Sequence, residues 1–239
     1  MKSINGLAYK SSEIPELGTY DAVAGEYYDE RLHPTCADFR TAARIYLRRF
    51  FEEVRPVGRF ADIGCGISLI ADFETGNLVL VDQSHEMLGQ NIQSLEKRCI
   101  NVEEETFGFS EFDWIFAILG DPYNSLAGWK NIQAALRSGG ECVFIVPSTD
   151  WTKAFRTKCD EEKPNFARFL TSKGDAIYLR SLIAEPQEQK QMIERASLSL
   201  VATEHVRVGE LPHVMSPKIS AFMSADQNLL DIYRAKKPS

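Results

Sequence analysis

The sequence lacks the features that mark exported and membrane-spanning proteins. Residues 1–6 contain no unbroken apolar run of the kind found in signal peptides, and no stretch of the 239 residues is apolar enough to cross a bilayer. The five cysteines form no C-x-x-C pair, and an odd number suits reduced thiols better than a disulfide framework. We therefore expect a cytoplasmic protein without a metal site.

Positive charge is also scarce. The chain has 27 lysines and arginines against 34 acidic residues, a net charge of -7. Non-specific nucleic-acid binding depends on counterion release by a basic surface, so a nucleic-acid partner is disfavoured. Six arginines gather in and after one predicted helix: Arg40, Arg44, Arg48, Arg49, Arg55 and Arg59. Because aromatic and apolar residues share that helix, we interpret them as a solvated face rather than an anion site.

Length and composition suit one folded domain. A chain of 239 residues can bury one large core, and its 44% hydrophobic and 26% charged residues are typical of globular proteins. Its patterns divide it into an N-terminal arm and covering helices (1–58), a core (59–147), an insert (148–185) and a final helix with strands (186–239).

Strand and helix patterns alternate along the core. Apolar runs predict strands at 59–63, 78–81, 114–119 and 141–146, and helical spacing predicts helices at 37–54, 84–98 and 125–136, with a brief helix ending near residue 73. This alternation predicts a parallel sheet with helices on both faces. The insert predicts a hairpin at 166–170 and 176–182, followed by a helix at 186–196 and strands at 198–208 and 229–234. Residues 1–18 show no period, and we expect an irregular arm over the core.

A glycine turn follows the first strand. Gly64 and Gly66 let the backbone turn sharply and approach a ligand closely, while Asp82, at the end of the next strand, can accept both hydroxyls of a ribose. Together they predict a nucleoside pocket. The fingerprint of dinucleotide-binding enzymes needs a third glycine or alanine where this chain has Leu69, which argues against a nicotinamide cofactor.

At this point the sequence resembles class I S-adenosylmethionine-dependent methyltransferases, whose first motif runs D-x-G-x-G-x-G. The ordered matches are Asp62-Ile63-Gly64-Cys65-Gly66-Ile67-Ser68, Val81-Asp82-Gln83-Ser84-His85-Glu86-Met87-Leu88, Phe112-Asp113 and Leu136-Arg137-Ser138-Gly139-Gly140. The resemblance covers residues 20–147 well. It implies a Rossmann-like three-layer α/β/α sandwich whose mostly parallel sheet has an antiparallel last strand, with S-adenosylmethionine as cofactor and S-adenosylhomocysteine as product.

The resemblance also implies roles for individual residues. Gly64 and Gly66 would pass under the methionine part of the cofactor, Asp82 would hold the ribose and Met87 would lie near the adenine. The cofactor-binding candidates are Tyr28, Asp62, Gly64, Cys65, Gly66, Asp82, Gln83, Met87 and Leu119. The acid that contacts the adenine amino group in many relatives would be Glu103, Glu104 or Glu105. Two departures stand out: Ser68 replaces the third glycine of the motif, and the segment from Gly66 to Asp82 is short.

Residues 120–124 follow the fourth strand, where this family places residues beside the reactive methyl group. They partly resemble the D/N-P-P-Y motif of amino-group methyltransferases, with one proline missing. Asp121 would accept a hydrogen bond from the acceptor and Tyr123 would shape the pocket, although a plain Asp-Pro turn fits equally well. Tyr20-Asp21 and Tyr27-Tyr28-Asp29 precede the core in the manner of small-molecule methyltransferases, whose N-terminal segments cover the cofactor. The four histidines suit surface or capping positions better than a catalytic role, and His33 lies beside this covering segment.

Three functions fit these patterns. The first is methyl transfer to a small molecule, with the arm before Tyr20 and the insert at 149–184 forming the pocket roof. The second is methylation of a protein or nucleic acid, suggested by the basic residues of the insert: Lys153, Arg156, Lys158, Lys163, Arg168, Lys173 and Arg180. The third is an inactive cofactor-binding module, suggested by Ser68 and the short first helix.

Overall fold

A seven-stranded sheet forms the centre of the protein, in the order β10-β11-β7-β6-β3-β4-β5. The computed structural model describes residues 2–4, 7–9, 18–73, 76–91, 94–156 and 165–239. The strands of the sheet are β3 (Phe60–Ile63), β4 (Leu78–Asp82), β5 (Glu96–Cys99), β6 (Phe112–Ile118), β7 (Leu136–Pro147), β10 (Ser199–Arg207) and β11 (Asn228–Lys236). Strands β5, β4, β3, β6 and β7 run parallel, whereas β11 is antiparallel to both β7 and β10.

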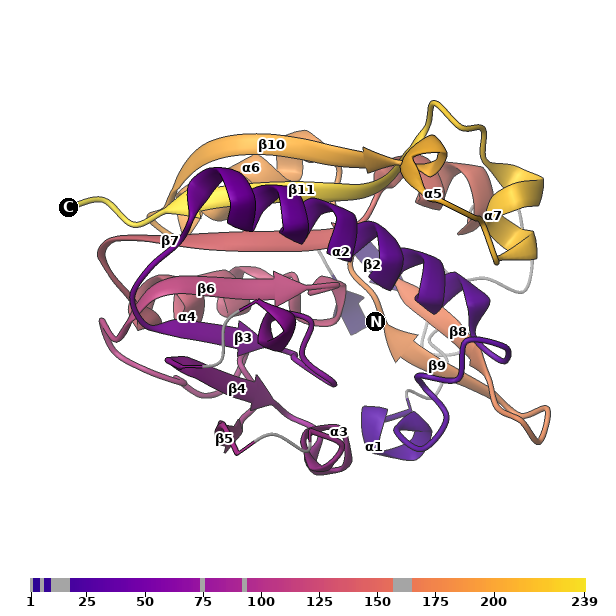
Figure 1. Ribbon diagram of the computed structural model, residues 1–239, viewed down its shortest axis with the longest axis horizontal. Helices are drawn as coiled ribbons and strands as arrows, with labels where there is room; N and C mark the ends of the chain where they lie inside the picture. Colours follow the sequence, from indigo (N-terminus) through magenta and orange to yellow (C-terminus); the bar gives the residue numbers. More distant parts are fainter. Residues whose placement is uncertain (1, 5–6, 10–17, 74–75, 92–93, 157–164) are drawn as a thin grey trace.

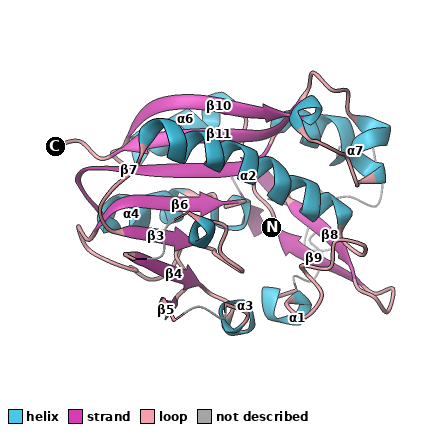
Figure 2. Cartoon of the chain, in the orientation of Figure 1, coloured by secondary structure: helices cyan, strands magenta, loops and turns pink. Residues whose placement is uncertain are grey.

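Helices cover both faces of this sheet (Figures 1 and 2). The helices of the described residues are α1 (Tyr20–Val23), α2 (Pro34–Val54), α3 (His85–Gly89), α4 (Leu126–Ala135), α5 (Thr149–Trp151), α6 (Pro186–Arg195) and α7 (Pro217–Phe222), with short turns at η2 (Ile70–Asp72), η3 (Asp121–Tyr123), η4 (Thr152–Arg156) and η5 (Val208–Glu210). Helix α2 crosses the front of the sheet, and α4 and α6 lie behind it. The result is a three-layer α/β/α sandwich, as the resemblance implied. No helix in the described ranges is both long and apolar enough to cross a membrane.

The strands are apolar on both sides because each face is buried by a helix layer. Phe60 and Leu80 belong to the cluster under α2, while Ile63 and Val81 belong to the cluster under α4 and α6. Helix α2 ends at Arg55, whose backbone is left-handed with φ 51°, immediately before Pro56. Every residue of the short strands β3 and β4 is therefore buried.

The carboxyl ends of β3, β4 and β6 all point to one side of the molecule, where α1, α3 and a two-stranded hairpin gather (Figure 1). This hairpin joins β8 (Phe166–Leu170) to β9 (Ala176–Arg180) in antiparallel register. It is tied to the N-terminal segment, because the backbone N–H of Gly18 donates to the carbonyl of Tyr178 at 2.9 Å. In open α/β sheets, ligands bind at this edge.

Most predicted elements are present, with two exceptions. The predicted helix at 84–98 starts as expected, with Ser84 as its cap, but its length is wrong: α3 ends at Gly89, and Glu96–Cys99 forms β5, which pairs in parallel with Val79–Asp82. The irregular arm is also wrong for part of its length, since β1 (Lys2–Ile4) and β2 (Leu7–Tyr9) pair antiparallel, while residues 10–17 lie outside the described residues. Helix α2 starts three residues earlier than predicted, at Pro34, which suits the first helical turn.

Candidate functional site

The glycine turn after β3 is hydrogen-bonded to the end of β4. Gly64 and Gly66 have φ angles of 60° and 48°, a left-handed conformation that glycine adopts without strain. The backbone N–H of Gly66 donates to the carboxylate of Asp82 at 2.9 Å, and the N–H of Ser84 donates to its other oxygen, also at 2.9 Å. The turn and the carboxylate, predicted separately from the sequence, therefore meet.

A second set of hydrogen bonds, made by Ser68 and Asn91, supports the glycine turn. Ser68 donates its hydroxyl to the carboxylate of Asp62 at 2.6 Å and accepts the N–H of Ala71 at 3.1 Å. Asn91 accepts the N–H of Ser68 and donates to the carbonyl of Gly66. Burial raises the pKa of Asp62 to about 8, against the opposing hydrogen bond from Ser68. The serine that replaces the third motif glycine is thus part of the support of the turn.

A cavity of about 590 Å³ lies above this turn. Its size falls within the range of roughly 300–1,000 Å³ that small-molecule sites occupy. Its floor includes Gly64, Cys65, Gly66, Asp82, Gln83 and Met87, and its far wall includes Leu119, Pro122, Tyr123, Leu179 and Arg180. The cavity therefore runs from the glycine turn to the loop after β6 and to the β8–β9 hairpin, which we call the roof hairpin.

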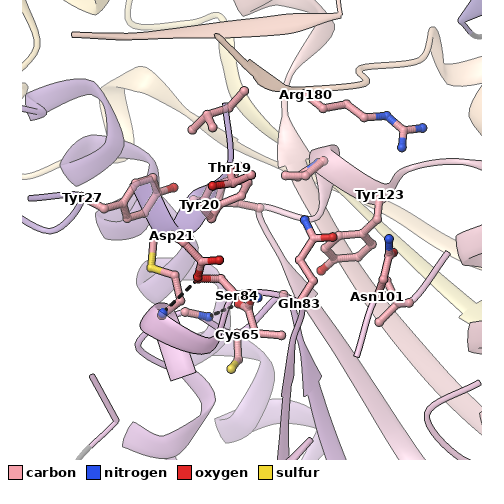
Figure 3. Close-up of a pocket in the computed structure, with 18 of the residues that line it drawn as sticks. Thr19, Tyr20, Asp21, Tyr27, Cys65, Gln83, Ser84, Asn101, Tyr123 and Arg180 are labelled. Carbon is pink, nitrogen blue, oxygen red and sulfur yellow. Dashed lines mark hydrogen bonds between the residues drawn. The ribbon is translucent and has the colours of Figure 1, made fainter. Parts of the chain in front are cut away.

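Helix α1 and the residues after it cover the cavity from the side of α3. Asp21 lies beside Ser84 (Figure 3) and accepts a hydrogen bond from its hydroxyl. It also accepts one from the N–H of Glu86. The hydroxyl of Tyr28 accepts the N–H of Ile67, one residue beyond Gly66. These contacts place the tyrosine-rich N-terminal segment directly over the glycine turn.

Arg40 is the unexpected member of this wall. It is 6% exposed and lines the cavity, and its guanidinium carbon lies 5.0 Å from the ring centre of Tyr28. No hydrogen bond or ion pair joins it to any residue of the described ranges, and one terminal nitrogen is fully buried without a partner. A buried cation without a partner is costly unless a ligand supplies the counter-charge. The interpretation of this arginine as part of a solvated face is therefore wrong.

Of the two candidate residues in the loop after β6, Tyr123 lines the cavity and Asp121 does not. The ring of Tyr123 lies over Gly64, where a methyl group added to that glycine would come within 2.4 Å of Cε1, and its hydroxyl donates to the carbonyl of Ile63. Asp121 instead accepts a hydrogen bond from the hydroxyl of Ser181. The oxygen of that hydroxyl in turn accepts a hydrogen bond from the guanidinium of Arg156 at 2.8 Å. The carboxylate of Asp121 thus faces the protein behind the cavity wall, and burial raises its pKa to about 6.

The end of the cavity near Tyr123 is also lined by polar side chains that follow β4 and β5. Gln83 and Asn101 lie side by side near Tyr123 (Figure 3). Glu103, Glu104 and Glu105 line this end as well, and Glu103 accepts hydrogen bonds from Ser125 and from Arg180 of the roof hairpin. These acids therefore reach the cavity, with Glu103 already paired.

The structure brings most of the sequence candidates together. Tyr28, Gly64, Cys65, Gly66, Asp82, Gln83, Met87, Leu119 and Tyr123 all line the cavity. Asp62 and Asp121 lie behind its walls, and His33 stacks on Phe169 with ring centroids 3.7 Å apart. Sequence reasoning missed Tyr20, Arg40 and Asn101; only the Tyr20-Asp21 pair before the core gave a signal for the first.

Solved structures with this architecture are numerous, although no protein-family model matches the chain and a search of curated proteins finds no relative. An S-adenosylmethionine-dependent methyltransferase from Clostridium acetobutylicum aligns with a TM-score of 0.58 and 13% identity, over 92% of this chain and 99% of that one. The DhpI–SAM–HEP complex aligns with a TM-score of 0.61 and 17% identity, over 92% and 94%.

A third structure contains both a small molecule and a cofactor product. It is the 1,6-didemethyltoxoflavin-N1-methyltransferase of Burkholderia thailandensis with bound 1,6-didemethyltoxoflavin and S-adenosylhomocysteine, with a TM-score of 0.51 and 15% identity over 95% of this chain and 93% of that one. The fold is that of class I S-adenosylmethionine-dependent methyltransferases. At these identities the likeness shows the methyltransferase fold alone, so the chemistry of this chain must be argued from its own residues.

Proposed function

We propose that this protein is an S-adenosylmethionine-dependent methyltransferase that acts on a small molecule. The observation that carries the proposal is the cavity in which the glycine turn and the Asp82 carboxylate meet and which continues to the loop after β6. An adenosine with a charged side chain fits the first part of this cavity. An acceptor fits the second.

The residues present suit each part of the cofactor. Each oxygen of Asp82 accepts one backbone hydrogen bond and keeps a lone pair for a ribose hydroxyl. Gln83, Asn101 and Met87 surround the end of the cavity where the adenine would lie. The bare backbone of Gly64 and Gly66 leaves room for the methionine part.

Charge supports the same assignment. The described lining contains the acids Asp21, Asp82, Glu103, Glu104 and Glu105, against Arg40 and Arg180. This excess of negative charge suits a ligand with a sulfonium and an ammonium group. Its single carboxylate matches Arg40, which is buried beside Tyr28 on the glycine-turn side and has no counter-ion among the described residues.

When bound, S-adenosylmethionine supplies an activated methyl group, so the protein has only to align an acceptor and exclude water. Thr19, Tyr27, Pro122 and Leu179 form the walls beyond the glycine turn, and the roof hairpin closes them. This partly aromatic, enclosed space favours a small acceptor.

We place Tyr123 in the pocket as a shaping residue, and Asp121 behind it as the residue that holds the loop to Ser181.

The alternative of a macromolecular acceptor receives little support from the insert. Arg156 is buried against Ser181, Arg180 pairs with Glu103 and Lys153 pairs with Glu185, so these cations do not form one open basic face. Lys158 and Lys163 lie outside the described residues. The alternative of an inactive cofactor-binding module is also less well supported. Ser68, which replaces the third glycine of the motif, donates a hydrogen bond to Asp62 and so supports the turn.

Calorimetry with S-adenosylhomocysteine tests the proposal. We expect saturable binding with one site per chain, and a protein that shows none at millimolar ligand would refute a cofactor site. Incubating the protein with a cell extract and S-adenosylmethionine labelled on the methyl group tests the acceptor. Label in the small-molecule fraction supports the proposal, whereas label confined to proteins or nucleic acids would replace it with the alternative.

A further inference from the structure

The roof hairpin packs against the N-terminal covering segment, residues 18–33. Phe169 of β8 stacks on the rings of Tyr27 and His33, with centroids 5.9 and 3.7 Å away. At the tip of the hairpin, the backbone N–H of Ser172 donates to the carboxylate of Glu26 at 3.1 Å. Because Phe169 and His33 are both buried, the hairpin and the covering segment are held together as one unit.

Buried hydrogen bonds also hold the base of this hairpin. The hydroxyl of Ser181 donates to the carboxylate of Asp121, and the backbone N–H of Leu182 donates to the carbonyl of Asp121 at 2.8 Å. All three residues are buried. Breaking such bonds would leave buried polar groups without partners, which is costly. The base of the hairpin is therefore a fixed point on the loop after β6.

An ion pair joins the end of the hairpin to the loop after β5. Arg180, the last residue of β9, pairs with the carboxylate of Glu103, and both residues line the cavity. Glu103 is held in place by the hydroxyl of Ser125, which donates to its other oxygen. The next two residues, Glu104 and Glu105, line the cavity as well and are exposed, so the cavity reaches solvent here. The ion pair thus lies at a mouth of the cavity.

This ion pair is easily broken. Its side chains are 34% and 17% exposed, and a pair in contact with water contributes little net stability because water hydrates both ions when they separate. Arg180 can also swing away by rotation about its side-chain bonds, with the backbone of β9 unmoved. The buried contacts of the hairpin can open only if the backbone moves.

We propose that the Arg180–Glu103 ion pair is a clasp over the cavity, and that its opening sets the rate at which cofactor and product enter and leave. This rests on the proposed function, in which S-adenosylmethionine enters and S-adenosylhomocysteine leaves in every cycle. A clasp that touches neither ligand hinders entry and exit by the same factor. It therefore changes both rate constants and leaves their ratio, the dissociation constant, unaltered.

Stopped-flow measurements with S-adenosylhomocysteine test the clasp. In Arg180→Gln and in Glu103→Gln, we expect the association and dissociation rate constants each to rise by about two- to fivefold, with the dissociation constant the same within about twofold. The double variant should be no faster than either single variant, because all three lack the same pair. Arg49→Gln, which breaks an exposed ion pair with Glu210 outside the cavity, is the matched control and should leave both rate constants unchanged.

Salt gives an independent measurement, because it screens exposed ion pairs. Raising sodium chloride from about 0.05 to about 0.5 M should speed dissociation from the wild type and not from Arg180→Gln. Rate constants that stay at the wild-type value in either single variant would overturn the clasp. A weaker affinity of Glu103→Gln at an unchanged association rate would also overturn it, because Glu103 would then contact the ligand. A wild-type protein that binds no S-adenosylhomocysteine would end this inference together with the proposed function.

Discussion

The carboxylate of Asp82 accepts the backbone N–H of Gly66 at 2.9 Å, so two residues 16 positions apart form one binding surface. Replacing Asp82 by Asn puts an amide where two N–H groups require acceptors. We expect the affinity for S-adenosylhomocysteine to fall by about ten- to a hundredfold, because hydrogen bonds to charged groups contribute about 1.5–3 kcal/mol. Calorimetry measures the loss, and Asp72→Asn, at an exposed carboxylate paired with Arg44, is the control. Equal affinity in both variants would remove Asp82 from the site.

Gly64 should not tolerate a side chain. Its φ is 60°, and an added methyl group would lie 2.4 Å from Cε1 of Tyr123. We expect Gly64→Ala to lower the free energy of unfolding by about 2–4 kcal/mol, the sum of left-handed strain and overpacking. Urea denaturation measures this change. Gly25→Ala, where nothing lies within 4 Å of the added methyl, should change stability by no more than about 0.5 kcal/mol.

Arg40 should recognise the carboxylate of the cofactor. We expect Arg40→Met to weaken S-adenosylhomocysteine by about tenfold or more, because a charge-assisted hydrogen bond is lost. Binding of methylthioadenosine, which has no carboxylate, should be unaffected. Arg44→Met, on the same helix but exposed, should change neither. If the loss were the same for both ligands, Arg40 would act through packing rather than charge.

Asp62 should make stability depend on pH. Its folded pKa of about 8 lies above the unfolded value, so between the two the folded protein holds a proton that the unfolded chain has released. Stability should therefore fall as pH rises through this window, by up to about 1.4 kcal/mol per pH unit. Denaturation at several pH values should show a flatter dependence in Asp62→Asn. Ser68→Ala, which removes the donor that lowers this pKa, should steepen the loss at high pH, and identical profiles would contradict the assignment.

His205 should act in the same direction as Asp62 but more weakly. Its Nδ1 lies 2.8 Å from the carboxylate of Asp231, and this hydrogen bond raises its pKa. The contribution of the pair is present below the unfolded pKa of histidine and is lost as pH rises through the folded pKa. Because the ring is partly exposed, we expect His205→Gln to cost no more than about 1 kcal/mol in acid and less in alkali. A cost that is independent of pH would mean that charge plays no part.

The sequence alone determined the layers of the fold and the floor of the site. Doubly apolar strands that alternate with amphipathic helices admit few arrangements, and the glycine turn with Asp82 is encoded in short segments whose geometry is local. For the same reason the hairpin of the insert could be predicted. The edge strand β5 could not, because Glu96–Cys99 has an exposed, charged surface and pairs only on one side.

Only the tertiary structure decided which side chains face the ligand. Arg40 and Arg44 are one helical turn apart and look alike in the sequence, yet one is buried at the cavity and the other is exposed, because the N-terminal segment packs over the first turns of α2. Asp121 lies in the predicted loop but bonds to Ser181, 60 residues away. Tyr20 lines the same cavity as Gly64, although the two lie 44 positions apart in the sequence. Contacts between distant segments set these directions, and no local pattern encodes them.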